Sequence, residues 1–594
     1  DSFFEHSSTD QEMCRFYNIQ PSDTILILRS NFSHAFCSFY FGHQLESDNS
    51  TVDTTGSVLI EDCRFEDYST SAALGIYDLD ADTSAVNDSN SDELWIYRVS
   101  VTIIDSLFRN SVGPHAVVDV VMAHRNELED DNATTFRVDF DGNDFSSNSV
   151  IQIVRFIADY DDAVAAGYEY LSGPNVRVHG NTFTDNECSF VVYENTQKAS
   201  YLELPLVFAV GNVFGGNEVE FGIFDVEHSE LSIWSSSISS HSGFLICCGS
   251  AWVTVNGLTA NETQILYLND SRRDSGWQYS TSIQIADSSF YSSSNAFELY
   301  LKPRDSLSFW RCNFSDATIA AMSGTQSAGL NDNDLSQSSG LHLDIESCVF
   351  HDFVDRSAFL LDSLAQDWAP NVTLRDCSVL DNDNNKSSRA SALFGVYHDD
   401  LGQLNDSSSV IAIESTLFRD NGDLFTIIED CSGCSNGQTL SMRFDDVLFS
   451  NNTGSTLYHR YSADLVAMTI TMNDCQWSGN RGHLTSAKAH SVATSLIEMA
   501  SRNLSAADCQ KHGNAQGGAH LILDAVNFTE NVFFPQSMMA ADCGMIDISG
   551  STFSGNNESI LSVEQSEVEI AESTFVGNEQ SHPSSQCMLC LFDA

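Results

Sequence analysis

The sequence predicts an all-β protein, a single right-handed parallel β-helix of about 16–18 coils with loop insertions. Three observations lead to this fold class. A short unit recurs along the 594 residues, as in EIAESTFVGNE (569–579) and ISGSTFSGNNE (548–558). Each unit alternates apolar and polar residues and lacks a helical period. The shortest repeat distances, from 528 to 553 to 575, fit one coil of a β-helix and are too short for a propeller blade.

The first element of each unit is an alternating segment, such as VLIEDCRF (58–65), VRVHGNTF (176–183) and LILDAVNF (521–528). Such alternation is typical of a strand with one buried face. A second apolar run often follows, as in AVVDVV (116–121) and ILSV (560–563). Each unit is therefore expected to contain a strand, a turn, a second strand and a third strand.

Each alternating segment ends in an aromatic anchor, which is Phe in most units and Trp477 in one. Ile238, Leu258 and Val379 are weaker members of the series. Because stacked strands lie about 4.8 Å apart, successive anchors are expected to form an internal column. The phenylalanine anchors are Phe32, Phe65, Phe108, Phe145, Phe183, Phe214, Phe290, Phe314, Phe350, Phe418, Phe449, Phe528, Phe553 and Phe575.

An asparagine follows the anchor by three residues in many units. Asparagine tolerates the left-handed backbone conformation of a turn, and stacked amides can hydrogen-bond along a column. The predicted turn and ladder residues are Asn148, Asn186, Asn217, Asn382, Asn421, Asn452, Asn480, Asn531, Asn556 and Asn578.

Two residues before the anchor, on the same face of the strand, the sequence favours Ser, Asn and Cys, which suit an interior row beside a bulky one. Cys312, Cys348 and Cys377 occupy this position in consecutive coils. We expect them to stack in the interior, either as disulfides between coils or as inert buried thiols.

The predicted organisation is an N-terminal cap at 1–20, the β-helix at 21–580 and a C-terminal strand or tail at 581–594. A solenoid has to cover its ends, so the tail is also a possible stacking end for another molecule. A short amphipathic helix is expected at 486–503. Insertions that leave the coils are expected near 70–97, 122–134, 159–174, 322–339, 384–408 and 482–518.

The chain is strongly acidic, with 83 Asp and Glu against 26 Lys and Arg and a formal net charge of -57. Such a field repels nucleic acid and anionic lipid, because binding phosphates needs clustered cations. No apolar stretch of about 18 residues is present, so no membrane span is expected. The sequence therefore excludes nucleic acid as a partner and favours cation binding.

Sixteen cysteines favour an oxidising compartment. Two CxxC pairs, Cys431 with Cys434 and Cys587 with Cys590, leave zinc as a rival interpretation, although about 150 residues separate them. The disulfide candidates, with the connectivity open, are Cys14, Cys37, Cys247, Cys248, Cys431, Cys434, Cys509, Cys543, Cys587 and Cys590.

Asn-x-Ser/Thr sequons together with the cysteines predict a secreted N-glycoprotein at the cell surface. The candidate glycosylation sites are Asn31, Asn49, Asn87, Asn132, Asn261, Asn269, Asn313, Asn371, Asn385, Asn405, Asn451, Asn503, Asn527 and Asn557.

Metal binding has one weak candidate. Asp78, Asp80 and Asp82 imitate the start of an EF-hand loop, but the glycine and the terminal glutamate that such a loop needs are missing. We prefer a solvated acidic loop here and expect no required cofactor, with calcium as a possible ligand. No catalytic residue is assigned, because the acidic pairs Asp445-Asp446 and Asp161-Asp162 are isolated in the sequence.

The FxxN units behind a VxI-type strand resemble the right-handed β-helix superfamily that includes pectin lyases. They are most similar to FxxN-repeat surface proteins such as the chlamydial polymorphic outer-membrane proteins and similar eukaryotic extracellular proteins. The resemblance covers roughly residues 20–580, and only GGAH (517–520) approaches the tetrapeptide that follows the chlamydial repeat. Enzymes of the superfamily carry NTD, DD, GHG and RIK clusters. Gly42-His43-Gln44 is the nearest match to GHG, and nothing resembles RIK.

The function that the sequence favours is a non-enzymatic extracellular structural glycoprotein. It would be a subunit of a surface filament, appendage or cell-wall layer, and its partners would be other copies of itself, extracellular proteins or glycans. The alternative is a calcium-assisted polysaccharide lyase or glycosidase. A second alternative is a carbohydrate-binding adhesin.

Overall fold

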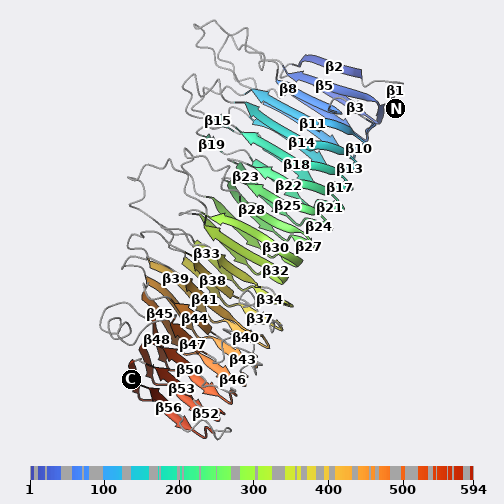
Figure 1. The fold of residues 1–594 in the computed structure, drawn as a ribbon. Coiled ribbons are helices and arrows are strands. Elements are labelled where there is room, and N and C mark those ends of the chain that lie inside the picture. The colour runs from blue at the N-terminus through green and yellow to red at the C-terminus, as the bar shows by residue number, and fades with distance from the viewer. Residues whose placement is uncertain are drawn as a thin grey trace, which may run out of the picture. The chain divides into compact units, whose positions relative to one another are not determined.

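The structure is a computed structural model. It describes residues 2–5, 11–19, 23–41, 56–67, 69, 72–78, 98–123, 135–159, 171–172, 175–196, 201–203, 206–226, 229–248, 251–268, 281–301, 305–323, 342–354, 357–362, 371–382, 394–399, 408–430, 439–453, 457–461, 467–481, 497–501, 519–532, 539–542, 545–557, 560–564, 567–579 and 589–592. The chain divides into unit 1, Asp1–Ile283, and unit 2, Gln284–Ala594. Both units are parallel β-helices, in which equivalent strands of successive coils lie side by side (Figure 1).

Unit 1 has three rows of parallel strands. The first row is β3 (Thr24–Leu28), β6 (Gly56–Glu61), β9 (Arg98–Ile104), β12 (Thr135–Asp141), β16 (Asn175–His179), β20 (Leu206–Val210), β23 (Ser229–Trp234) and β26 (Ala251–Asn256). The second row is β1 (Ser2–Glu5), β4 (Ser30–Ser33), β7 (Arg64–Glu66), β10 (Leu107–Arg109), β13 (Asp144–Ser146), β17 (Thr182–Thr184), β21 (Val213–Gly215), β24 (Ser237–Ser239) and β27 (Thr259–Asn261). The third row is β2 (Gln11–Ile19), β5 (Ala35–Phe41), β8 (Leu74–Asp78), β11 (Val112–Ala123), β14 (Ser149–Asp159), β18 (Glu187–Thr196), β22 (Glu218–Val226), β25 (Ser242–Cys248) and β28 (Gln264–Leu268).

Unit 2 repeats the arrangement. Its first row is β31 (Ser306–Trp310), β33 (His342–Glu346), β36 (Asn371–Arg375), β39 (Ser408–Glu414), β42 (Thr439–Asp445), β45 (Ala467–Asn473), β48 (Ala519–Asp524), β51 (Met545–Ser549) and β54 (Glu567–Ala571). Its second row is β34 (Val349–His351), β37 (Ser378–Leu380), β40 (Leu417–Arg419), β43 (Leu448–Ser450), β46 (Gln476–Ser478), β49 (Asn527–Thr529), β52 (Thr552–Ser554) and β55 (Thr574–Val576). Its third row is β35 (Phe359–Asp362), β38 (Phe394–Asp399), β41 (Phe425–Asp430), β44 (Leu457–Tyr461), β47 (Ile497–Ser501), β50 (Met539–Asp542), β53 (Leu561–Glu564) and β56 (Leu589–Phe592).

Five further strands complete the inventory. The long strands β30 (Ser289–Leu301) and β32 (Asn313–Ser323) serve the second and third rows of unit 2 together. A separate two-stranded parallel sheet joins β15 (Leu171–Ser172) and β19 (Tyr201–Glu203). The strand β29 (Ser282–Ala286) contains the division between the units.

The all-β parallel β-helix expected from the sequence is therefore confirmed, and in the part of the chain that the structure describes the first rows, together with β29, contain 18 strands. Three of the predictions differ in part from the structure. The N-terminal segment contains β1 and β2, which pair with β4 and β5 and continue the coils instead of forming an irregular cap. Within the predicted insertions, β8, β15, β38 and β47 are strands, and all but β15 belong to the third rows. The helix predicted at 486–503 is wrong for Ile497–Ser501, because β44 and β50 pair with this segment as β47.

The aromatic anchors form a buried column in each unit. In unit 1 the rings of Phe65 and Phe108 stack with centroids 4.9 Å apart and planes 1° from parallel. In unit 2 the rings of Phe449, Trp477 and Phe528 stack at 4.4 and 4.7 Å. These spacings match the distance between adjacent strands, so each ring contacts its equivalent in the next coil.

The asparagines at the third residue after the anchor form ladders. In unit 1 the side-chain amide of Asn148 donates to the carbonyl of Phe108 at 3.1 Å and to Oδ1 of Asn186 at 2.9 Å. Asn186 repeats the pattern with Phe145 and Asn217. In unit 2 the same amide-to-amide bond, at 2.7–3.0 Å, links in turn Asn382, Asn421, Asn452, Asn480, Asn531, Asn556 and Asn578.

A second ladder runs along the position two residues before the anchor. There the backbone N–H of one coil donates to the side chain of the next, as from Ser106 to Asn143 and from Asn143 to Asn181, both at 2.9 Å. In unit 2 a thiol takes the acceptor role, because the N–H of Cys312 donates to Sγ of Cys348 at 3.3 Å. Small polar side chains at this position therefore satisfy backbone groups that the turn would otherwise leave unpaired.

The sequence predicted the ladder asparagines as the left-handed turn residues, and this prediction is wrong. The left-handed residues lie three residues before and two residues after the anchor. Examples are Asp105 and Asn110 around Phe108, with φ of 48° and 58°, and Ala525 and Glu530 in unit 2, with φ of 53° and 55°. The anchor strand therefore lies between two left-handed residues, and the asparagine adopts an ordinary conformation with its side chain turned inward.

The register also corrects one anchor. Ile238 pairs with Ala260, not with Leu258, so Ala260 occupies the anchor position in that coil. Leu258 is buried at the position two residues before it. An apolar residue at either position gives the same alternating pattern, which is why the sequence could not separate the two.

The coil at 567–579 is less covered than the others. Phe575 stacks on Phe553 at 4.7 Å, but its ring is only half-buried. Ile570, which lies at an apolar position of the alternating segment, is 38% exposed. Among the described strands, β54 and β55 pair on one side only, with β51 and β52.

Candidate functional site

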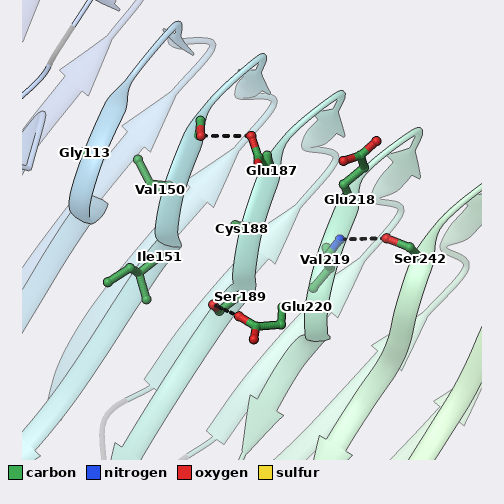
Figure 2. A pocket seen from close by; sticks show the side chains of 11 residues that line it. Gly113, Val150, Ile151, Glu187, Cys188, Ser189, Glu218, Val219, Glu220 and Ser242 are labelled. Atoms are coloured by element: carbon green, nitrogen blue, oxygen red, sulfur yellow. Dashed lines mark hydrogen bonds between the residues drawn. The ribbon is translucent and has the colours of Figure 1, made fainter.

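A groove of about 440 Å³ lies on the third row of unit 1. It crosses β11, β14, β18, β22 and β25 near the points where these strands begin (Figure 2). Its lining residues are Gly113, Ser149, Val150, Ile151, Glu187, Cys188, Ser189, Glu218, Val219, Glu220 and Ser242.

Three exposed carboxylates dominate the groove. Glu187 and Glu218 lie in register on neighbouring strands, and Glu220 lies two residues farther on the same face as Glu218. Two of them each accept a hydrogen bond from a serine hydroxyl. Ser149 Oγ donates to Glu187 at 3.0 Å, and Ser189 Oγ donates to Glu220 at 2.8 Å. The groove therefore presents hydrogen-bond acceptors and negative charge, which suit cations or ligands rich in hydroxyl and amino groups.

Irregular strand pairing accompanies the groove. The ladder between β11 and β14 shifts register after Gly113, and the ladder between β18 and β22 shifts after Cys188. The next ladder shifts after Glu218 and brings the backbone of Gly243, with φ of 83°, against Val219. A Cβ at Gly243 would lie 2.6 Å from the Val219 carbonyl, so only glycine fits there. Such bulges re-aim side chains and are frequent beside binding sites.

Next to the groove, His241 replaces an asparagine in the ladder, one residue before Ser242. Its side chain is 6% exposed, and neither ring nitrogen has a partner at hydrogen-bond geometry. Burial lowers the pKa of His241 to about 4, against a smaller opposing effect of the backbone at Phe244 and Asn217. The imidazole is therefore neutral at physiological pH.

A separate polar network lies on the third row nearer the N-terminus. Arg155 donates two hydrogen bonds to Asp119, both at 2.7 Å, and Tyr77 donates to the same carboxylate at 3.5 Å. Burial and the nearby charge of Asp119 raise the pKa of Tyr77. A phenol with a raised pKa is a poor base, and the arginine is already bidentate, so this network is best explained as a brace between coils.

Metal binding finds no support in the described part of the chain, where no three His, Cys, Asp or Glu side chains come together in a metal-binding arrangement. Asp78 ends β8, whereas Asp80 and Asp82 lie outside the described residues. The isolated pair Asp445-Asp446 lies at a first-row turn, where Asp445 accepts a bond from Asn473 at 2.7 Å.

The disulfide candidates are only partly described. Cys14 and Cys37 lie at paired positions of β2 and β5. Cys247 and Cys248 are both buried in β25, and Cys590 lies in β56. The remaining candidates, Cys431, Cys434, Cys509, Cys543 and Cys587, lie outside the described residues.

The sequons differ in exposure. Four candidate asparagines are exposed, three are half-buried, and the others, namely Asn49, Asn87, Asn132, Asn269, Asn385, Asn405 and Asn503, lie outside the described residues. The exposed ones are Asn261, Asn371, Asn451 and Asn527, and the half-buried ones are Asn31, Asn313 and Asn557. Oδ1 of Asn313 lies 2.9 Å from Nε2 of His351, so this side chain is engaged within the protein.

Sequence reasoning missed the groove carboxylates. A signal was present, because consecutive units end in NTFTDNE (181–187) and NVFGGNE (212–218), each with Glu directly after the ladder asparagine. In-register pairing turns this repeated Asn-Glu step into neighbouring carboxylates. The bulges that hollow the surface around them leave no comparable pattern.

Comparison with known proteins adds little beyond the fold. No protein-family model matches the chain. No curated protein matches it either. One solved structure with some likeness is a PL6 family alginate lyase, AlyGC, at 8% identity over 94% of this chain and 97% of that chain, with a TM-score of 0.18. The strand register itself places the chain among the parallel β-helix proteins.

Proposed function

We propose that the protein is a non-enzymatic, extracellular structural glycoprotein that serves as a subunit of a surface filament, appendage or wall layer. The observation that carries this proposal is the pair of internal ladders. The amide-to-amide bonds of the asparagine ladder join one coil to the next, as between Asn531 and Asn556, and the stacked anchors do the same, as between Phe528 and Phe553. A coil of a second copy would continue the same bonds, so the contacts that build the fold would also serve assembly.

Further support comes from the surface. Four exposed sequon asparagines offer sites for N-glycans, and the net charge of -57 keeps separate copies soluble until cations screen it. Assembly would therefore be favoured by calcium or by high salt. Because each copy carries the same ladders, head-to-tail growth needs no second kind of subunit.

The test is direct imaging with sedimentation. The full chain at high concentration, with and without calcium, is examined by negative-stain electron microscopy and analytical ultracentrifugation. We expect filaments or a concentration-dependent series of oligomers. A monomer at every concentration and salt condition, with no filaments in native material, would rule out the assembly role.

The acidic groove supports a second candidate, a site that binds or cleaves a polysaccharide. Glu187 and Glu218 are register partners on adjacent strands and both line the groove, so a ligand bound there would meet both carboxylates. The groove is open along several coils, as an extended glycan requires. It would act as a calcium-assisted lyase or glycosidase, or bind glycan without cleaving it.

A polysaccharide panel separates these possibilities. The chain is incubated with neutral, acidic and amino-sugar polymers, with and without calcium, and both binding and depolymerisation are measured. Glu187→Gln is expected to abolish any activity of the groove, whereas Glu262→Gln, an exposed change outside it, should have no effect. Depolymerisation that Glu187→Gln removes would favour the enzyme over the structural protein.

A further inference from the structure

The first two described coils bring two cysteines together. Cys14 on β2 and Cys37 on β5 are register partners in a parallel ladder, which places their Cα atoms about 4.8 Å apart. This lies within the range of about 4.4–6.8 Å that a disulfide spans. The register continues two residues on, where the rings of Phe16 and Phe39 stack at 5.1 Å with planes 4° apart.

The phenylalanine pair fixes the direction of the cysteines. In a strand, residues two apart point to the same face, so the stacked rings of Phe16 and Phe39 show that both cysteine side chains point the same way. The two thiols also interact, because a hydrogen bond with Cys37 lowers the pKa of Cys14, against the opposing effect of its partial burial.

Solvent exposure distinguishes this pair from the other described cysteines. Of the ten cysteine side chains that the structure describes, Cys14 alone is not buried. Cys312, Cys348 and Cys377 also stack, but each is at most 2% exposed, and hydrogen bonding to its two neighbours together with burial raises the pKa of Cys348. That column has no exposed sulfur for an oxidant to reach, whereas the N-terminal pair combines one reachable thiol with one buried thiol beside it.

We propose that Cys14 and Cys37 form a disulfide that ties the first two described coils together, with Cys14 as the attacking thiol. The oxidant is a low-molecular-weight disulfide. The thiolate of Cys14 attacks one sulfur of this disulfide, forms a mixed disulfide and releases one small thiol. Cys37 then gives up its proton and attacks Sγ of Cys14, which releases the second small thiol. Two protein thiols are oxidised and one small disulfide is reduced to two thiols, so atoms and electrons balance.

The pair ties a region that other contacts hold weakly. Each coil of a solenoid contacts only its neighbours, and among the described strands β1 and β2 pair on one side only, with β4 and β5. A covalent link between β2 and β5 closes the chain around β3 and the anchor Phe32. This inference does not depend on the proposed function, because it concerns how the coils are joined and not what they bind.

The experiment follows the sulfur atoms in the full chain. The protein is reduced, freed of reductant, incubated with oxidised glutathione, blocked with an alkylating agent in denaturant and mapped by mass spectrometry. We expect one new crosslinked peptide that joins Cys14 to Cys37, while Cys312, Cys348 and Cys377 are recovered alkylated.

Two variants and a control assign the roles. Cys37→Ser should accumulate a stable mixed disulfide between Cys14 and glutathione, whereas Cys14→Ser should leave Cys37 reduced. Cys475→Ser, at a buried site whose equivalents in the neighbouring coils are Val447 and Val526, should leave the crosslink unchanged, and circular dichroism checks that each variant folds. Recovery of Cys14 and Cys37 as separate alkylated peptides, or a crosslink from Cys14 to another cysteine, would overturn the proposal.

Discussion

At the scale of single residues, His241 is the clearest departure from the pattern of the coils. It occupies the ladder position after Asn217 and leaves both of its ring nitrogens without a hydrogen-bond partner. Asn217 still donates to the carbonyl of Phe183 at 2.9 Å, but it has no amide oxygen in the next coil to bond. The ladder of unit 1 is therefore interrupted beside the groove.

His241 should make the protein sensitive to acid. Its pKa in the folded state, about 4, is below the ordinary value of 6.5, so the unfolded chain binds the proton more readily between these values. The contribution of His241 to the free energy of unfolding should therefore be fully present above pH 6.5. The free energy of unfolding should fall by about 3 kcal/mol as the pH decreases to 4. Urea unfolding at pH 7, 5.5 and 4 measures this loss.

The matched variant is His241→Asn, which restores the ladder residue. It should supply the missing acceptor to Asn217, add about 1–2 kcal/mol to the free energy of unfolding at pH 7, and remove most of the acid-dependent loss. An acid-dependent loss of the same size in His241→Asn would assign the sensitivity to other groups.

The ladder asparagines should be costly to truncate. In Asn531→Ala the N–H and side-chain amide of Asn480 lose their acceptor, and the carbonyl of Trp477 loses its donor. We expect a loss of about 2–4 kcal/mol in the free energy of unfolding, since these groups remain buried. Asn527→Ala, on the exposed side of the same coil, is the control and should change little in protein made without N-glycosylation. Equal losses of the free energy of unfolding in Asn531→Ala and Asn527→Ala would show that the ladder hydrogen bonds do not stabilise the coil.

Residue-scale prediction from sequence succeeded where chemistry demands one side chain. The ladder position uses one acceptor and two donors, as at Asn148, and a hydroxyl has only one donor, so the ladder residues recur as Asn. Asp and Gly are the most frequent residues at the left-handed positions, but Ser147 and Ala525 adopt the same conformation, so residue type alone does not locate these positions. Backbone hydrogen bonds between coils impose that conformation, as from the N–H of Ala525 to the carbonyl of Ser549.

At the scale of the structural element, the aromatic column predicts a graded response at Trp477. This ring is fully buried between Phe449 and Phe528. Trp477→Ala should cost about 3–5 kcal/mol, because it removes both stacking contacts and leaves a cavity. Trp477→Phe should cost roughly 1 kcal/mol, since phenylalanine is the usual anchor. Thermal unfolding of the two variants compares them, and a tolerated Trp477→Ala would mean that the column does not carry this stability.

The elements themselves were predictable to different degrees. First-row strands could be predicted from the alternation of apolar and polar residues, as in LILDAVNF (521–528), because one face of the strand is buried and the other faces water. The third row was harder, since β47 at Ile497–Ser501 follows a long acidic-poor segment with helical spacing and gains its conformation only by pairing with β44 and β50. The groove could not be predicted, because bulges arise from how β18 and β22 pair and not from either strand alone.

At the scale of the whole molecule, stability should be local. Each coil bonds only to its neighbours, so damage to one ladder step should loosen adjacent coils and spare distant ones. In Asn531→Ala, hydrogen exchange measured by mass spectrometry should accelerate in β46, β49 and β52 and remain unchanged throughout unit 1. Uniform acceleration over both units would show that the chain unfolds as one cooperative body.

The net charge sets a second expectation for the whole chain. With a formal charge of -57, carboxylates on neighbouring coils repel one another, and salt screens this repulsion. Raising sodium chloride from low to near-molar concentration at pH 7 should increase the unfolding midpoint by several degrees. A midpoint that falls with salt would indicate that ion pairs such as Arg155 with Asp119 outweigh the repulsion.

The paired left-handed residues have a consequence for how such a chain can change in length. They lie five residues apart in coil after coil, from Arg29 and His34 to Glu572 and Gly577, although the anchors are separated by anything from 22 to 51 residues. The number of residues between the two left-handed positions is therefore fixed, whereas the length of the rest of the coil varies. Evolution can lengthen a coil after its third strand without disturbing the segment between the two left-handed residues. A protein engineer could insert foreign loops at the same place in successive coils.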